Sequence, residues 1–296
     1  MTQNTIYKKA YAKVNLALDV TGVRDNGYHD VRMVMQNLDL YDELRFEVVD
    51  EPLSEAVRYS INIESNVTGI PTDERNLIYK AVKLLFDEYD ISSTINIYLE
   101  KNIPVEAGMA GGSTDAAAAL HAVNELYSLG LSVDRLMELG VKLGADVPFC
   151  VLGRTALSEG IGEILTEIPC LPPCHVLVAK PAVGVSTAMV YKALDSKPIE
   201  QHPDVDGMVE AMRQQKLDAV AQLMGNVLER VTIPMHPVID DIKNAMLEQG
   251  ALNAMMSGSG PTVYGIYEDE EGAQAALRAI EKMQLADKLY VTRPIG

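Results

Sequence analysis

The chain has 296 residues, of which 48% are hydrophobic and 23% charged, an ordinary composition for a globular protein of one or two domains. Its formal charge of −17 argues against general nucleic-acid binding, because affinity for phosphate backbones comes mainly from lysine and arginine. No apolar run is long enough to span a bilayer and residues 1–9 lack an apolar signal core, so we expect a cytoplasmic protein without a membrane partner.

The first part of the chain alternates between predicted strands and helices. Residues 12–20 alternate between apolar and other side chains, which places Lys13 and Asn15 together on one face of a strand. A helix is expected to begin near Asn76, and a second helix, rich in alanine, near Ser113. Further strands are predicted at residues 31–38, 43–49, 57–65 and 94–100.

A new series of strands and helices begins after Glu167. The proline-rich segment 168–173 is the best candidate for a linker. Strands are predicted at residues 175–179, 254–256, 262–267 and 288–292, and helices at 186–194, about 206–226, 238–249 and 272–283. We therefore predict an α/β (α+β) protein with two domains, residues 1–166 and 167–296.

A glycine-rich segment, residues 104–117, carries the clearest chemical signal. It follows a predicted strand and opens the alanine-rich helix, and free amides at a helix N-terminus can bind phosphate. We expect Gly108, Gly111 and Gly112 to allow positive φ angles and a close approach to a ligand. The segment lacks the Lys-Ser/Thr ending of a P-loop and does not match GxGxxG. A strand–turn–helix junction without a ligand is the alternative interpretation.

Asp115 lies at the start of the same helix. A carboxylate there suits the helix dipole but would repel a bound polyphosphate. Three arrangements remain open from the sequence. The side chain points away, pairs with a cation such as Lys13, or helps to hold Mg²⁺.

Three segments together resemble the GHMP kinases. Residues 104–117 resemble the Pro-x-x-x-Gly-Leu-Gly-Gly/Ser-Ser-Ser motif, and Ala12-Lys-Val-Asn-Leu16 resembles the N-terminal motif. Met256-Ser-Gly-Ser-Gly-Pro-Thr-Val263 resembles the C-terminal glycine motif. The resemblance implies the two-domain GHMP kinase fold, with an N-terminal domain like ribosomal protein S5 domain 2 and a ferredoxin-like C-terminal domain.

Two further strings resemble one branch of that family. Gly27-Tyr-His29 and Leu143-Gly-Ala-Asp-Val-Pro-Phe149 are similar to strings of the kinases that act on 4-diphosphocytidyl-2-C-methyl-D-erythritol, and residues 75–78 and 158–163 add to the likeness. The resemblance implies transfer of phosphate from ATP, with Mg²⁺, to the 2-hydroxyl of this small molecule. It places the reaction in the non-mevalonate isoprenoid pathway.

The resemblance also implies roles for single residues. Asp146 corresponds to the general base, and Lys13 to the cation that orients it and offsets charge on the moving phosphoryl group. Asn15 would hold the diphosphate or erythritol end of the substrate. The cytidine would be recognised by Tyr28 and His29, with Tyr191 stacking on the base. ATP binding is assigned to Pro104, Val105, Glu106, Ala107, Gly108, Met109, Ala110, Gly111, Gly112, Ser113 and Thr114, together with Asn76.

Each of these residues also has an ordinary interpretation. Lysine on a strand is usually solvated, which is the alternative for Lys13. Asp146 precedes a predicted helix and could simply cap it. His29 could lie on the surface, and Tyr191 could only pack the second domain. Ala110 departs from the glycine usual in the family motif, and alanine is strained at positive φ.

Two rival functions remain open from the sequence. One is a GHMP kinase of another small hydroxyl substrate, such as homoserine or phosphomevalonate. The other is a non-catalytic GHMP-like protein that only binds a ligand. The sequence does not identify metal ligands, and a monomer and a homodimer are both compatible with it.

Overall fold

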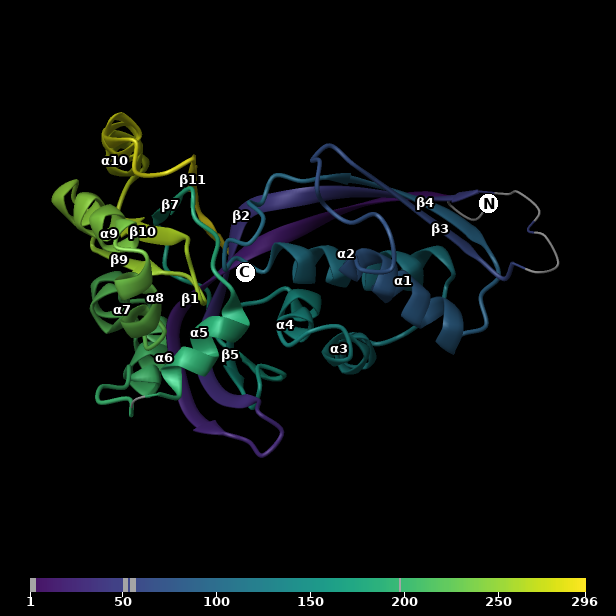
Figure 1. The fold of residues 1–296 in the computed structure, drawn as a ribbon, viewed down its shortest axis with the longest axis horizontal. Helices are drawn as coiled ribbons and strands as arrows, with labels where there is room; N and C mark the ends of the chain where they lie inside the picture. Colours follow the sequence, from purple (N-terminus) through teal and green to yellow (C-terminus); the bar gives the residue numbers. More distant parts are fainter. Residues whose placement is uncertain (1–3, 50–52, 54–56, 197) are drawn as a thin grey trace. The chain divides into compact units, whose positions relative to one another are not determined.

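The structure is a computed structural model that describes residues 4–49, 53, 57–196 and 198–296 (Figure 1). The chain folds into two units, each built from stretches that are separate in sequence. Unit 1 comprises the chain up to Ala12, Leu40–Ile103 and Ala110–Gly153; unit 2 comprises Lys13–Asp39, Pro104–Met109 and Arg154–Gly296. The division at residues 166 and 167 stays a prediction.

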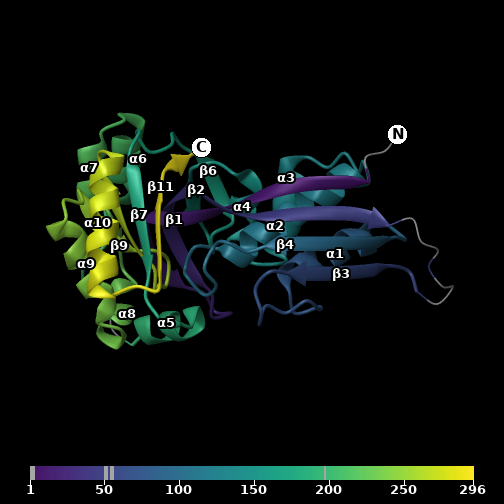
Figure 2. The same cartoon turned by 90° about the horizontal axis from the view of Figure 1, so that it is seen from above.

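Unit 1 has helices on one face of a sheet (Figures 1 and 2). Its strands are the first part of β1 (Thr5–Val23), the second part of β2 (His29–Val49), β3 (Ser60–Ser65) and β4 (Thr94–Glu100). Strand β4 pairs antiparallel with β2 and parallel with β3. The helices are α1 (Leu77–Glu88), α2 (Gly111–Leu126), α3 (Val133–Val141) and α4 (Val147–Leu152).

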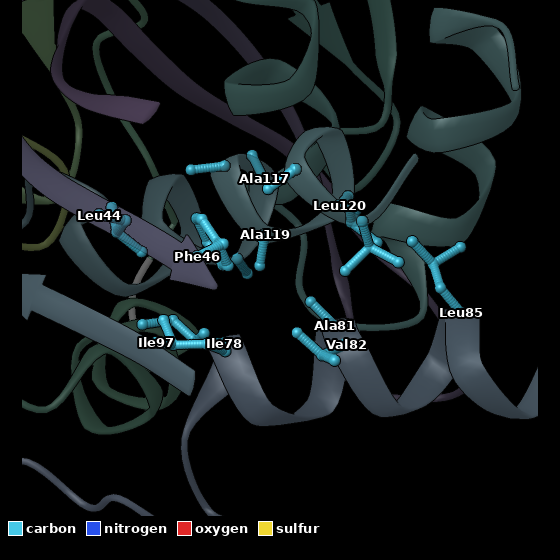
Figure 3. Close-up of a cluster of buried hydrophobic side chains, with 14 of the residues drawn as sticks. Leu44, Phe46, Ile78, Ala81, Val82, Leu85, Ile97, Ala117, Ala119 and Leu120 are labelled. Atoms are coloured by element: carbon cyan, nitrogen blue, oxygen red, sulfur yellow. The ribbon is translucent and has the colours of Figure 1, made fainter. Parts of the chain in front are cut away.

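Helices α1 and α2 supply much of the hydrophobic core of unit 1 (Figure 3). Helix α1 buries Ala81 and Leu85, which lie one helical turn apart and therefore on one face. Ala117 and Leu120 of α2 are also buried, and the small alanine side chains let α2 approach its neighbours closely. The core thus holds the helix that begins directly after the glycine-rich segment.

Unit 2 contains a four-stranded antiparallel sheet covered by helices. The sheet has the order β11 (Lys288–Thr292), β7 (His175–Lys180), β10 (Val263–Tyr267), β9 (Asn253–Met256). Helices α9 (Val238–Glu248) and α10 (Glu270–Met283) contact it (Figure 2). The other elements are α5 (Thr187–Leu194), α6 (Val205–Arg213), α7 (Leu217–Leu223), α8 (Glu229–Met235), β5 (Ala156–Glu159), β6 (Ile164–Glu167), β8 (Gly225–Asn226) and β12 (Pro294–Ile295).

Three expectations from the sequence are wrong in detail. The strands expected at residues 31–38 and 43–49 are one strand, because the intervening Asp42 is satisfied by backbone N–H groups and does not end it. The helix expected over residues 206–226 is two helices, separated at Gln215, which has a φ angle of +54°. The candidate linker 168–173 packs into unit 2, where Leu171 is buried and its N–H donates to the side chain of Gln36.

No helix among the described residues has both the length and the apolar character needed to cross a membrane.

Phe86 offers a test of the core of unit 1. Its side chain is fully buried, and its ring meets the rings of Tyr59 and Tyr127 edge-on at centroid distances of 5.6 and 5.3 Å. We expect Phe86→Ala to lower the free energy of unfolding by about 3–5 kcal/mol, because it removes a buried ring and leaves a cavity. Urea denaturation followed by circular dichroism measures this. The control Phe86→Leu should lose clearly less, and equal losses in the two variants would contradict the prediction.

Candidate functional site

Gly108 lies where two glycine-containing loops touch through their backbones, within unit 2. Its φ angle is +70°, and a Cβ atom at this position would overlap the carbonyl oxygen of Ser257. Ser257 Oγ donates a hydrogen bond to the carbonyl oxygen of Gly108 at 3.0 Å. Both the φ angle and the available space therefore require glycine here. The two glycine motifs of the sequence, 149 positions apart, meet at this contact.

The second of these loops is held by its own hydrogen bonds and by one buried side chain. The N–H of Ser257 donates to the carbonyl of Thr262, and that of Gly260 to the carbonyl of Ser257, both at 2.9 Å. Asn226 Nδ2 donates at 2.8 Å to the carbonyls of both Met256 and Gly258. Asn226 lies about 30 positions away in a segment without a motif, so nothing in the sequence points to it.

Lys13 and Asn15 lie side by side on β1 in unit 2. Lys13 is only 4% exposed, so its interpretation as a solvated lysine is wrong. Its Nζ donates to Asn15 Oδ1 at 2.8 Å, and its backbone N–H donates to the carbonyl of Met109 at 3.2 Å. The hydroxyl of Tyr264 donates to the carbonyl of Asn15 at 2.7 Å. The strand thus holds a buried cation next to the glycine-rich loop.

Helix α2 begins immediately after that loop, in unit 1. Ala110 precedes it in a left-handed conformation with a φ angle of +57°, the strained state expected for alanine at this position. The N–H of Thr114 donates to the carbonyl of Ala110 at 2.9 Å. The preceding amides, of Gly111, Gly112 and Ser113, have no partner within a helix and can meet an anion.

The positive φ angles expected at Gly111 and Gly112 are not found, because both residues lie inside α2. Gly111 instead lies close against the end of a lysine side chain. A Cβ atom there would lie 2.9 Å from Lys101 Nζ. Lys101 in turn donates to Asp115 Oδ2 at 2.8 Å, so the cation that the structure gives Asp115 is Lys101.

Asp146 lies in unit 1, directly before α4. Its φ and ψ angles are −82° and −14°, and its side chain makes no capping hydrogen bond to the helix. The interpretation of Asp146 as an ordinary helix cap is therefore wrong. Pro148 in the first turn needs no N–H partner, so the helix can begin without a side-chain cap. The half-buried carboxyl group is not used to start the helix.

His29 and Tyr191 meet in unit 2. Their ring centroids are 4.8 Å apart with an angle of 48° between the planes, and His29 Nε2 lies 2.8 Å from Asp195 Oδ1. Asp195 is 166 positions from His29, and sequence analysis did not find it. When Nε2–H donates to this carboxylate, Nδ1 of a neutral imidazole is left as an acceptor. Tyr28, next in the chain, is 57% exposed.

Asn76 has a structural role at the start of α1. Its Oδ1 accepts from the N–H of Ile78 at 2.8 Å, and its Nδ2 donates to the carbonyl of Pro71 at 2.6 Å. These bonds occupy both ends of the amide. Its contact with ATP stays a prediction.

No group of three or more His, Cys, Asp or Glu side chains that could hold a metal ion occurs among the residues described in the structure. Mg²⁺ in phosphoryl-transfer sites is commonly bound through one or two carboxylates together with substrate phosphates, which does not require such a group.

The contact at Gly108 generates a stability prediction. Gly108→Ala places a methyl group against Ser257 O at positive φ, whereas Gly130 has a φ angle of +66° and nothing within 4 Å of its Cβ position. In Gly130→Ala, the free energy of unfolding should therefore fall only through backbone strain at positive φ, by about 1–2 kcal/mol. Gly108→Ala should lose about 1–3 kcal/mol more through overpacking. Thermal unfolding of both variants decides this, and equal losses would contradict the close contact.

Family models and curated relatives match this chain over most of its length. The model of the GHMP kinases N terminal domain matches residues 76–154, and that of the GHMP kinases C terminal domain matches residues 208–284. A protein of Lachnospira eligens named 4-diphosphocytidyl-2-C-methyl-D-erythritol kinase is 50% identical over 97% of this chain and 98% of its own. A protein of the same name from Exiguobacterium sibiricum is 47% identical over 99% of each chain.

Solved structures agree with the sequence matches. A crystal structure of 4-(cytidine 5'-diphospho)-2C-methyl-D-erythritol kinase superposes with a TM-score of 0.81 at 31% identity, covering 98% of this chain and 100% of its own. Homoserine kinase from Cytophaga hutchinsonii, at 21% identity and a TM-score of 0.77 over 99% and 95% of the chains, shows a common fold. The predicted two-domain GHMP kinase fold is confirmed, and the chain belongs to the GHMP kinases.

Proposed function

We propose that this protein transfers the γ-phosphoryl group of ATP to the 2-hydroxyl of 4-diphosphocytidyl-2-C-methyl-D-erythritol, in the cytoplasm and within the non-mevalonate isoprenoid pathway. The names of its 50% and 47% identical relatives support this substrate. The observation in the structure that carries the proposal is the cluster of His29, Tyr191 and Asp195, which provides an aromatic face and an oriented imidazole for a base.

The nucleotide side of the reaction would use the glycine-rich loop. Phosphoryl transfer depends on positioning and on neutralising charge, and it needs little covalent help from the protein. The amides at the start of α2 and the hydroxyls of Ser113 and Thr114 form a donor set suited to phosphate oxygens. Mg²⁺ would be held mainly by the phosphate oxygens of ATP, and it neutralises their charge when bound.

The acceptor side would use Asp146, Lys13 and Asn15. The substrate hydroxyl loses its proton to the Asp146 carboxylate as its oxygen bonds to the γ-phosphorus, and the bond from that phosphorus to the leaving oxygen of ADP breaks. Lys13 is buried and hydrogen-bonded to Asn15, so its positive charge would be held in place and only weakly screened by water. Asn15 would orient the diphosphate or erythritol end.

The cytidine side would use the imidazole of His29. With Nε2–H donating to Asp195, Nδ1 can accept a hydrogen bond from the exocyclic amino group of cytosine. Uracil has a carbonyl at that position, so the same histidine would disfavour uridine. Tyr191 lies beside His29 and offers a stacking face, and the exposed ring of Tyr28 is available for the same purpose.

Two rival functions have less support. Homoserine and mevalonate kinases share the fold at 21% and 18% identity. Identity this low supports a common fold and does not support a common substrate. A GHMP-like protein that only binds a ligand would not need a buried lysine on β1 beside the glycine-rich loop.

Asp146→Asn tests the general base. The amide cannot take a proton from the acceptor, so we expect kcat to fall by about 10²–10⁴-fold while ATP binding is retained. Release of ADP with Mg-ATP and the cytidylylated methylerythritol measures this. Asp134→Asn, an exposed aspartate in the first turn of α3, is the matched control and should turn over normally. Retained turnover in Asp146→Asn would remove Asp146 from the mechanism.

Asp195→Ala tests the recognition of cytidine. Loss of the partner of Nε2 frees the imidazole to change tautomer, and we expect KM for the cytidine substrate to rise by about tenfold. KM for ATP should not change, nor should either constant in Asp218→Ala, an exposed aspartate of α7. A rise in both KM values of Asp195→Ala would indicate general damage and contradict this assignment.

A further inference from the structure

Three charged side chains are buried together in unit 1. The side chains of Asp42, Lys101 and Asp115 are 0%, 6% and 5% exposed. Lys101 Nζ donates to Asp42 Oδ2, and also to Asp115 Oδ2 at 2.8 Å. Buried charges are costly unless they are paired and hydrogen-bonded, so a retained cluster of this kind calls for a role.

The cluster joins the chain segment directly before the glycine-rich loop to the helix directly after it. Asp42 Oδ1 accepts the N–H groups of Asn102 at 2.6 Å and Ile103 at 2.8 Å, directly before Pro104. Asp115 lies in the second turn of α2, the helix that follows the loop. A single lysine between these two carboxylates therefore fixes the distance between the two ends of residues 104–110.

Gly111 couples the lysine to the first turn of α2. A Cβ atom at Gly111 would lie 2.9 Å from Lys101 Nζ and 3.3 Å from Ile103 Cγ2. The amine thus lies against the backbone whose amides would meet phosphate. Any shift of Lys101 would allow this turn to move, and displacements near 1 Å in such sites have large effects.

One carboxylate oxygen of the cluster is left without a donor. Fully ionised, two carboxylates and one lysine leave one buried negative charge, and Asp115 Oδ1 has no hydrogen-bond partner among the described residues. Burial, opposed by the charge of Lys101 and reinforced by that of Asp42, raises the pKa of Asp115 to about 8.

We propose that Asp42, Lys101 and Asp115 form a positioning network that holds both ends of the glycine-rich loop for ATP and keeps one proton on Asp115. The ligand in this inference rests on the proposed function. The proton keeps the network neutral next to the loop. Its loss places a negative charge near the phosphates of ATP, and ATP then binds more weakly.

The sign of the pH dependence follows from the raised pKa. Between the ordinary aspartate pKa of 3.8 and about 8, the folded protein holds a proton that the unfolded chain releases. The contribution of Asp115 to stability is therefore fully present below the ordinary value and is lost as the pH rises through about 8. Asparagine is uncharged and nearly the same shape, so Asp115→Asn should not show this loss.

The experiment measures ATP binding by calorimetry between pH 7 and 9, together with KM and kcat for both substrates. Lys101→Met should weaken ATP binding about tenfold or more and leave KM for the cytidine substrate unchanged. Asp115→Asn should lose less of its ATP affinity between pH 7 and pH 9 than the wild type does. Lys83→Met, a half-exposed lysine of α1, is the control and should match the wild type.

Two results would overturn the network. The first is wild-type ATP affinity in folded Lys101→Met. The second is the same pH profile for Asp115→Asn and the wild type, and this comparison also decides the matter if Lys101→Met does not fold. A wild-type protein that binds ATP but does not phosphorylate the cytidine substrate would instead overturn the proposed function, since binding is measured separately from turnover.

Discussion

The backbone contact between Gly108 and Ser257 is the constraint on which the arrangement of unit 2 depends. No side chain separates the two loops, so a hydrogen bond from Ser257 Oγ and the carbonyl groups themselves set their spacing. The carbonyl oxygen of the next residue, Met109, accepts a hydrogen bond from the backbone N–H of Lys13. Strand β1, the glycine-rich loop and the C-terminal glycine loop are therefore held together by backbone atoms and the hydroxyl group of Ser257. Only the glycines make that approach possible.

Buried polar side chains complete the site at points where the backbone does not. Asn226 holds two carbonyl groups of the C-terminal loop, and Asn15 holds Lys13. In unit 1, Lys101 joins Asp42 and Asp115 around the start of α2. Such groups stabilise a fold less well than apolar packing of the same volume. Within each unit, polar groups held in this way suit a preorganised anion site, because fixed dipoles and charges need not rearrange during the reaction.

Much of the secondary structure could be predicted from the sequence. The sequence predicts β4 and β11 with their observed bounds, and α9 to within one residue, because their apolar residues follow a clear period. The single helix expected over residues 206–226 failed at Gln215, since a non-glycine residue with positive φ leaves no sequence signal. Two of the three loop glycines were misinterpreted for a related reason. A glycine within a helix, such as Gly111, looks the same in sequence as one with a positive φ angle, such as Gly108.

The motifs of the candidate site could be predicted from the sequence, but the side chains that contact the motif residues could not. Lys13 and Asn15 come together because two residues on a strand share a face, which the sequence states directly. Asp195 beside His29 and Lys101 beside Asp115 depend on the tertiary fold, which brings distant segments together. The burial of Lys13 also could not be predicted, because an isolated lysine is usually exposed.

The proposed function depends above all on which acceptor molecule the protein phosphorylates. The most direct measurement incubates the protein with Mg-ATP and an equimolar mixture of cytidylylated methylerythritol, homoserine, mevalonate and phosphomevalonate, and identifies by mass spectrometry which compound gains a phosphoryl group. We expect the cytidine compound alone to be phosphorylated. Phosphorylation of any other acceptor in its place would contradict the substrate assignment, and no phosphorylation by folded, ATP-binding protein would contradict the kinase function itself.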